Sequence, residues 1–423
     1  AVRLGPAEVG PDAQLPPGTG LVVTSPGLRP DTPLLARAVA AGVEVIGDVE
    51  LAWRLRPVLP DGGRQQWLAV TGTNGKTTTV RMLAVMLAAA GHRSIAAGNV
   101  GIPILDVITE PEPYEVIAVE LSSFQLYWSV TVAPLAAAVL NVAAHHLDWH
   151  DDLAAYAAAK ARIFGPGTIA ICNADDPCTV TMADRAVQEG RASRKVAFRL
   201  GPPRHGELGV IGGWLTDRAF GNQTAAVALA ETAAVRPPAP HNVADALAAA
   251  ALARAYGAGA GSIAAGLAAF VPEPHRISLV AELDGVAFVD DSKASNPAAA
   301  GASLASFPSI VWIAGGLFRG SDEDLDAIVT AAAPRLRAVV LLGTDAARFA
   351  RALARHAADV PVTGVAGTDT GVMDQVVVHA AQAAERGDTV LLAPAAQSWD
   401  MFRDYAARGE AFAAAVRRLA DQQ

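Results

Sequence analysis

The segment Thr71–Thr78, which reads TGTNGKTT, has the residue types and the spacing of a phosphate-binding loop. It lies between an apolar run at 67–72 that predicts a buried strand and a segment at 76–90 that predicts a helix. Glycines let successive N–H groups face one point, and the helix amino terminus adds partial positive charge there. Lys76 can reach the outer phosphates of a nucleotide, and the Thr77 hydroxyl can ligate magnesium. An ordinary glycine turn is the alternative, but the predicted phosphate-binding residues form a full set: Gly72, Thr73, Asn74, Gly75, Lys76, Thr77 and Thr78.

Further polar residues follow the next two apolar runs. Glu120 ends the run EVIAVE, where a carboxylate beside the phosphate loop could hold magnesium on the phosphates, or could be a solvated charge at a strand end. His145 and His146 follow the run AAAVLNV, and they could ligate a metal or be ordinary loop histidines. Lys160 lies on the helix predicted next, where a surface lysine is the default interpretation.

The pattern of apolar runs and breaks predicts an α/β protein with three domains. Near-continuous apolar runs alternate with helical segments, as in parallel sheets that are covered on both faces. One of the helices is expected over 241–257, and Gly257 would end it. Breaks rich in Pro or Gly at 57–63 and 272–274 separate the segments. We therefore expect a Rossmann-like first domain at 1–62, a central phosphate-loop domain at 63–272 and a Rossmann-like third domain at 273–423.

The composition excludes several classes of protein. Of the 423 residues, 52% are hydrophobic and 18% charged, so the chain is not intrinsically disordered. A net charge of −9 argues against nucleic-acid binding. We expect no membrane insertion, because no run reaches about 18 uncharged apolar residues. Two cysteines, Cys172 and Cys178, cannot form a disulfide framework or a zinc site, and the first residues do not form a signal peptide, so we expect a cytoplasmic protein.

In its motifs and their order, the chain resembles the Mur ligases. The resemblance rests on TGTNGKTT, GNVGIP, VELSSFQL, NVAAHHLD, AAAKARI, HNVADALAA, PHRI and DDSKASNP, which span nearly the whole chain. It implies an ATP-dependent amide ligase that works through an acyl phosphate in peptidoglycan precursor synthesis. SPG at 25–27, DSKASN and the late SWDMFRDYAARG are similar to the branch that adds D-glutamate. The implied substrates are ATP, D-glutamate and UDP-N-acetylmuramoyl-L-alanine, and a monomer is expected.

The resemblance also implies the residues that hold Mg2+. Thr77 and Glu120 would hold one ion, and His146 and Lys160 would serve a second, with Lys160 carbamylated by carbon dioxide. A carbamate turns a cationic amine into an anionic oxygen donor, which suits magnesium. The implied catalytic residues are Lys76, Glu120, His146 and Lys160.

The remaining implied contacts fall into three groups by substrate. Beyond the phosphate loop, ATP would meet Asn242, Arg276 and Asp291. The UDP-muramoyl substrate would meet Ser25, Asn99, Ser122 and Gln125, together with His146. A cation and several hydroxyl groups suit the two carboxylates of D-glutamate. The residues implied for that substrate are Lys293, Ser295, Arg319, Ser398 and Tyr405.

The chain departs from the family pattern at single positions and at its front. His145 stands where family members commonly have Asp, Asp245 replaces Asn, Arg319 replaces Lys and Tyr405 replaces Phe. The strand, glycine-rich turn and helix that open the family's first domain have no counterpart here, so we expect a partial first domain. Two rival hypotheses stay open, a ligase for another amino acid such as L-glutamate and a non-catalytic nucleotide-binding protein of cell-wall synthesis.

Overall fold

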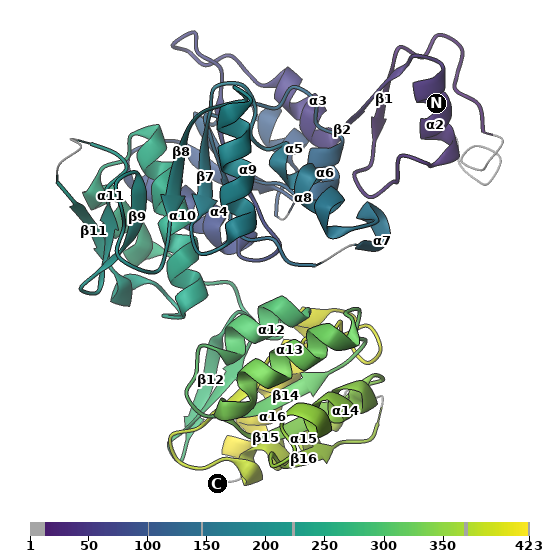
Figure 1. The fold of residues 1–423 in the computed structure, drawn as a ribbon, viewed down its shortest axis with the longest axis vertical. Helices are drawn as coiled ribbons and strands as arrows, with labels where there is room; N and C mark the ends of the chain where they lie inside the picture. Colours follow the sequence, from purple (N-terminus) through teal and green to yellow (C-terminus); the bar gives the residue numbers. More distant parts are fainter. Residues whose placement is uncertain (1–12, 100, 145–146, 222–224, 368–370, 422–423) are drawn as a thin grey trace. The chain divides into compact units, whose positions relative to one another are not determined.

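The computed structural model describes residues 13–99, 101–144, 147–221, 225–367 and 371–421 (Figure 1). The chain divides into two compact units, Ala1–Phe270 and Val271–Gln423. Each unit is built from helices around a mainly parallel sheet, which confirms the predicted α/β class. None of the helices in the described part of the chain is both long enough and apolar enough to cross a membrane.

A small βαβ element opens the described chain. Strand β1 (Leu21–Thr24) pairs in parallel with β2 (Glu44–Gly47), and α2 (Pro33–Ala40) connects them. Helix α3 (Asp48–Leu55) follows directly and carries the fully buried Glu50. The Glu50 carboxylate accepts hydrogen bonds from the backbone N–H groups of Val130 and Thr131, both at 2.8 Å. This carboxylate therefore attaches α3 to the loop that precedes β6 (Ala136–Val139).

The described residues of the first unit form a sheet with the strand order β11-β10-β9-β8-β7-β6-β3-β5-β4. Strands β3 to β9 are parallel, and β9, β10 and β11 are antiparallel neighbours. This antiparallel extension was not predicted from the sequence. The strands are β3 (Gln66–Thr71), β4 (Ser94–Gly98), β5 (Val116–Glu120), β6 (Ala136–Val139), β7 (Thr168–Asn173), β8 (Ala192–Phe198), β9 (Glu207–Ile211), β10 (Trp214–Asp217) and β11 (Val227–Glu231).

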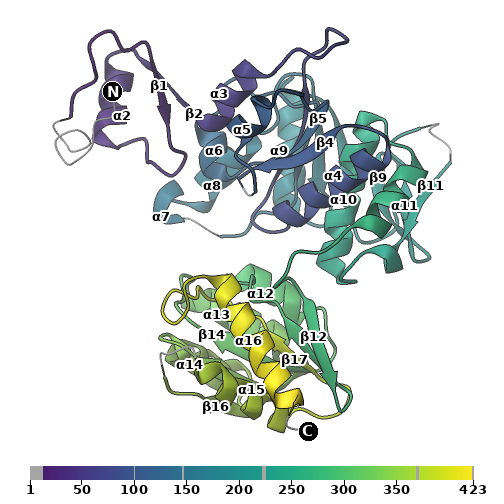
Figure 2. The same ribbon diagram turned by 180° about the vertical axis from the view of Figure 1, so that it is seen from behind.

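Helices cover both faces of this sheet (Figure 1 and Figure 2). One face packs against α4 (Lys76–Ala89), α10 (Pro240–Tyr256) and α11 (Ala260–Ala269). Gly257 ends α10 in a left-handed conformation, as predicted. The opposite face packs against α3, α5 (Ile104–Ile108), α6 (Ser123–Tyr127), α8 (Leu153–Ala161) and α9 (Pro177–Gln188), and α7 (Leu147–His150) precedes α8.

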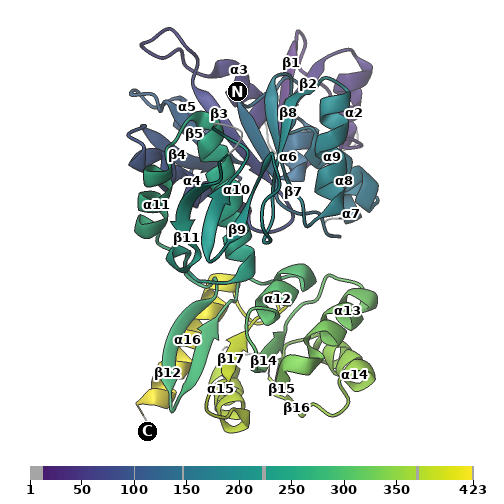
Figure 3. The same cartoon turned by 60° about the vertical axis from the view of Figure 1, so that its left-hand side comes forward.

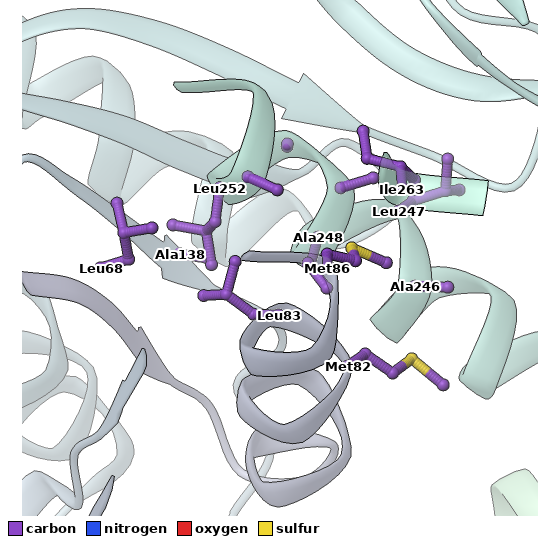
Figure 4. Close-up of a cluster of buried hydrophobic side chains, with 14 of the residues drawn as sticks. Leu68, Met82, Leu83, Met86, Ala138, Ala246, Leu247, Ala248, Leu252 and Ile263 are labelled. Carbon is purple, nitrogen blue, oxygen red and sulfur yellow. The ribbon is translucent and has the colours of Figure 1, made fainter. Parts of the chain in front are cut away.

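The core beneath the phosphate loop combines many alanines with larger Leu, Val, Ile, Met and Phe side chains (Figure 4). Leu83 and Met86 of α4 belong to the same cluster as Leu247 and Leu252 of α10, and the small alanines between these two leucines let α4 and α10 pack together. Helix α11 approaches even more closely at Gly266, where a Cβ atom would lie 2.6 Å from the Cα atom of Met86. The helix that begins with Lys76 is thus held from two sides.

The second unit has a six-stranded sheet in its described part, with the order β12-β13-β17-β14-β15-β16. Only the pair β12–β13 is antiparallel among these neighbours. The strands are β12 (Ser278–Leu283), β13 (Val286–Asp290), β14 (Ile310–Gly315), β15 (Leu336–Leu342), β16 (Val362–Gly364) and β17 (Thr389–Leu392). One face carries α12 (Pro297–Leu304), α13 (Asp322–Ala332) and α14 (Ala346–His356), and the other carries α15 (Val372–Ala383) and α16 (Tyr405–Ala420) (Figure 2 and Figure 3).

The close approach of α11 to α4 can be tested with Gly266→Ala. The added methyl group would meet the backbone of Met86, so we expect a loss of about 1–3 kcal/mol in the free energy of unfolding, the usual range for overpacking. Gly261→Ala on the same helix is the control, because a Cβ there meets no atom of the described residues within 4 Å. Chemical denaturation of both variants measures the difference, and equal stability would show that the helices can move apart freely.

Candidate active site

The phosphate loop connects the end of β3 to the first turn of α4. Gly75 adopts a left-handed conformation with a φ of 83° and precedes Lys76, the first residue of the helix. The ammonium group of Lys76 donates to the carbonyl oxygens of Gly72 at 3.1 Å and Thr73 at 2.9 Å. A Cβ at position 75 would lie only 2.2 Å from a carboxylate oxygen of Asp245, so this position requires glycine for its space as well as its conformation.

Asn141 braces this loop from the end of the neighbouring strand. Its side-chain oxygen accepts from the N–H groups of Thr73 at 3.1 Å and Asn74 at 2.8 Å, and its amide donates to the Asn74 carbonyl at 3.2 Å. This role of Asn141 was not predicted from the sequence. The available signal was its place two residues beyond β6, which lies beside β3 in the sheet.

Glu120 lies beside Thr77, as the predicted magnesium site requires. Parallel register places Glu120 opposite Val70 of β3 and Gly98 of β4, so all three strands end at one edge. The Glu120 carboxylate is 1% exposed and accepts from the Thr77 hydroxyl at 2.8 Å and the Asn99 amide at 3.0 Å. The alternative of a solvated strand-end charge is therefore wrong. A hydroxyl and a carboxylate are the hard oxygen donors that Mg2+ prefers.

Lys160 faces the interior of the unit, and the alternative of a surface lysine is wrong. Its side chain is 1% exposed, and its amine donates to the Gly72 carbonyl at 2.8 Å. Burial, and then the charge of Lys76, hold the pKa of Lys160 well below its ordinary value, although Glu120 acts in the opposite direction. The amine therefore loses its proton more easily than an exposed lysine does.

The ring of Tyr156 packs against the amine of this lysine. The Lys160 nitrogen lies 4.4 Å from the ring centroid, and the Tyr156 hydroxyl lies 3.3 Å from the hydroxyl of Thr73 in the phosphate loop. Burial raises the pKa of Tyr156 to about 12, so the phenol is neutral at physiological pH. Tyr156 connects Lys160 with the phosphate loop, a role that the sequence did not indicate.

The second predicted metal set includes His146, which lies outside the described residues together with His145. Across the residues that the structure does describe, no group of three or more His, Cys, Asp or Glu side chains could hold a metal ion. Lys160, the other member of this set, lies near Glu120 of the first predicted set, since the charge of Glu120 acts on the Lys160 amine.

Gln125 and Ser122, predicted to bind substrate, form the first turn of α6. Ser122 caps the helix, and the Gln125 side-chain oxygen accepts from the N–H and hydroxyl groups of Ser122 at 3.0 and 3.2 Å. The Gln125 amide is 3.5 Å from Asp48 and only 4% exposed. Asn242, on α10, likewise donates to the Pro237 carbonyl at 3.1 Å. Ser25 is exposed on the loop after β1.

In the second unit, loops at the carboxyl ends of three parallel strands carry the residues predicted for D-glutamate. The loop after β13 holds Lys293 and Ser295, and Ala294 between them accepts a hydrogen bond from Ala395 in the loop after β17. Leu317 and Gln397 exchange two backbone hydrogen bonds at 2.9 and 3.0 Å. The Lys293 ammonium lies 3.7 Å from the ring centroid of Tyr405. The joined loops carry Lys293, Ser295, Arg319 and Ser398, with Tyr405 beside them.

Arg408 holds these loops together from within the core. It is 1% exposed, and its guanidinium donates to the hydroxyl and carbonyl oxygens of Ser292 at 2.9 and 2.8 Å and to the Ala396 carbonyl at 3.0 Å. The Ser292 hydroxyl in turn donates to the Tyr405 carbonyl at 2.7 Å. Burial lowers the pKa of Arg408 to about 10, which leaves it charged at neutral pH. The sequence did not single out Arg408, because an arginine on a helix is usually exposed.

Two residues predicted to meet ATP also lie in the second unit. Arg276 pairs with Glu273 at 2.9 Å. Asp291 is buried, accepts from the Ile277 N–H group at 3.3 Å and makes a short hydrogen bond with the Ser303 hydroxyl. Burial raises the pKa of Asp291 to about 6, so its charge is costly to keep in the folded unit.

Comparison with known proteins gives the family. The Mur ligase middle domain matches residues 70–253, and the glutamate ligase domain of Mur ligases matches residues 275–396. A relative from Thermobifida fusca is 57% identical over 98% of this chain and 88% of its own length. The chain belongs to the Mur ligase family. Relatives from Streptomyces avermitilis and Frankia casuarinae are 54% and 56% identical over 97% and 95% of the chain, and cover 87% and 82% of their own lengths.

Solved structures share the fold. The MurF ligase of Thermotoga maritima, in complex with ADP, superposes with a TM-score of 0.63 at 18% identity, covering 95% of both chains. The UDP-N-acetylmuramate-alanine ligase of the same organism superposes with a TM-score of 0.59 at 19% identity, over 96% of this chain and 86% of that one. At such identities the likeness establishes the three-domain fold of the family.

The raised pKa of Asp291 predicts a gain in stability for Asp291→Asn. The folded pKa of about 6 exceeds the ordinary 3.8, so the wild-type unit loses stability as the pH rises from about 4 to 6. The amide carries no charge, and we expect Asp291→Asn to raise the free energy of unfolding by about 1–3 kcal/mol at pH 7.5 and by little at pH 4.

The matched control is Asp388→Asn, in the same unit. Hydrogen bonds from Ser309 and Glu385 and the charge of Arg337 outweigh burial and lower the pKa of Asp388. We therefore expect Asp388→Asn to lower the free energy of unfolding at pH 7.5. Denaturation curves at both pH values measure the two variants. If Asp291→Asn is no more stable than the wild type at pH 7.5, the buried carboxylate carries no such penalty.

Proposed function

We propose that this chain adds D-glutamate to UDP-N-acetylmuramoyl-L-alanine in peptidoglycan precursor synthesis, with conversion of ATP to ADP and phosphate. The observation that carries the proposal is the similarity to three relatives named UDP-N-acetylmuramoylalanine–D-glutamate ligase, each at least 54% identical. Membership of the family makes the chain an ATP-dependent amide ligase, and the substrates are those that the relatives' names state.

The reaction requires activation of a carboxylate. An oxygen of the alanyl carboxylate attacks the γ-phosphorus of ATP, the bond to ADP breaks, and an acyl phosphate forms. The amine of D-glutamate then attacks the acyl carbon and loses a proton, and the carbon–oxygen bond to phosphate breaks to leave the amide. Both steps bring anions together, so the site must supply positive charge and N–H donors.

The phosphate loop supports this role with donors already in place. Lys76 and the N–H groups at the start of α4 would receive the phosphates of ATP, and Asn141 keeps the loop in shape. Thr77 and Glu120 would hold Mg2+, which would offset the charge on the phosphates. Asn242, Arg276 and Asp291 are the further residues that we propose for ATP, as the family resemblance implies.

Lys160 is the residue that we propose to be carbamylated. A neutral amine is needed, because its lone pair forms the new bond to the carbon of CO2 and the nitrogen then releases a proton. The lowered pKa of Lys160 and its enclosure support this step. The carbamate, with His146, would give oxygen and nitrogen donors for a second Mg2+.

The other substrates would meet residues of both units. Ser25, Asn99, Ser122 and Gln125 are proposed for the UDP-muramoyl part. Asn99 and Gln125 would act there by holding Glu120 and Ser122, to which they are bonded. The linked loops of the second unit would receive D-glutamate through Lys293, Ser295, Arg319, Ser398 and Tyr405. We also propose a cytoplasmic monomer with functional domains at 1–62, 63–272 and 273–423.

An amino-acid-dependent assay tests the proposed function. Phosphate release from ATP should require both UDP-N-acetylmuramoyl-L-alanine and D-glutamate, with the amide product seen by mass spectrometry. Preference for L-glutamate or another amino acid would favour a different ligase of the same family. Tight ATP binding without phosphate release under any of these conditions would favour a non-catalytic role.

Lys160→Ala tests the proposed carbamate. We expect activity to fall by about 100-fold or more, the scale of losing a charged group from an active site, and short carboxylates such as formate to restore part of it. Lys195→Ala is the control, since that lysine pairs with Asp184 near the surface. Activity within about twofold of the wild type for Lys160→Ala would remove Lys160 from the catalytic residues, since one active-site group is worth far more than that.

A further inference from the structure

His150 is a buried polar side chain that the proposed reaction leaves without a role. It ends α7, is 4% exposed, and its Nε2 atom lies 2.9 Å from the Ser123 hydroxyl. Its ring lies parallel to that of Phe124, with centroids 5.5 Å apart and an interplanar angle of 2°. These contacts set the orientation of the imidazole, because a polar ring placed in a core keeps the arrangement that satisfies its nitrogen atoms.

The His150 ring also meets the ring of Tyr156. Their centroids are 5.3 Å apart at 65°, an edge-to-face arrangement. Tyr156 in turn reaches the Thr73 hydroxyl at 3.3 Å and lies under the Lys160 nitrogen at 4.4 Å. An unbroken row of contacts therefore runs from Ser123 at the start of α6, through His150 and Tyr156, to the phosphate loop and Lys160.

We infer that His150 is a positioning residue that sets the place of Lys160 and of the phosphate loop through Tyr156. Its effect on rate rests on the proposed function. If the imidazole turns away from Ser123, the Tyr156 ring loses its lateral support and can rotate. The phenol would then leave Thr73, and the space around the Lys160 amine would widen. A displacement of about 1 Å at an active site can lower the rate by about 100-fold.

A plain space-filling role is the rival explanation, and substitutions separate the two. Phenylalanine would fill the same space without a ring nitrogen, whereas glutamine can still donate to or accept from Ser123. A cavity of about 470 Å³ also reaches His150, between Arg29, Tyr127, Trp149 and the alanines of α8. Imidazole from solution could enter this cavity and occupy the place vacated in His150→Ala.

The kinetic test compares His150→Phe, His150→Gln and His150→Ala with the wild type. We expect kcat to fall by about 10-fold or more in His150→Phe, and by less in His150→Gln, which keeps the hydrogen bond. Imidazole should raise the activity of His150→Ala in a saturable way. His92→Phe is the matched control, because His92 also bonds a side chain, Glu115 at 2.9 Å, and meets a tyrosine ring, Tyr256 at 4.8 Å. It should stay within about twofold of the wild type, since these two partners of His92 lie outside the proposed site.

A second readout needs no substrate and therefore separates this inference from the proposed function. Acetic anhydride labels amines in their neutral form, and mass spectrometry can follow Lys160 against the exposed Lys195 in the same molecules. We expect faster labelling of Lys160 in His150→Phe than in the wild type, and no change in His92→Phe. If the wild type has no ligase activity, this labelling difference still tests the position of Lys160.

Two results would overturn the inference. One is His150→Phe with wild-type kcat and wild-type labelling of Lys160. The other is a loss of activity that is equal in His150→Phe and His150→Gln, unaffected by imidazole in His150→Ala, and matched by the fall in melting temperature. Either result would make His150 a core side chain that only fills space.

Discussion

The carbonyl oxygen of Gly72 accepts hydrogen bonds from two lysines, Lys76 at 3.1 Å and Lys160 at 2.8 Å. Two ammonium groups that share one acceptor repel each other, and burial adds to the cost of charge on the more enclosed one. The neutral form of Lys160 relieves both costs. The surrounding structure serves this arrangement, since the loop after β3 presents the carbonyl, α4 supplies Lys76 and α8 supplies Lys160.

The parts of the fold that the sequence predicted well are those with local signals. The glycine-rich turn, the apolar strand before it and the left-handed Gly257 are each specified by residues close together in the chain. The short strands β9, β10 and β11 were missed because their pattern is brief and their pairing depends on the rest of the sheet. The burial of Lys160 was not visible either, since the alanine-rich α8 has no polar face to contrast with an apolar one.

In the candidate site too, some residues are recognisable from the sequence and others only from the folded chain. Lys76, Thr77 and Glu120 are recognisable because their chemistry and their place at strand ends coincide. Asn141 and Arg408 bond backbone groups far away in the sequence, those of Asn74 and Ser292, so only the folded chain reveals them. Family resemblance implies Gln125 and Asn99 as substrate contacts, and the folded chain adds that their side-chain groups are bonded to Ser122 and Glu120.

The single guanidinium of Arg408 has a consequence for how the second unit could change over evolution. Because it bonds the loop after β13 and the loop after β17 at once, a substitution that shifts one loop will shift the other. Residues on these loops should therefore show strongly non-additive effects in double-mutant cycles. A new amino-acid preference would then require coordinated replacements in several loops, and the chance of reaching it one substitution at a time would be small.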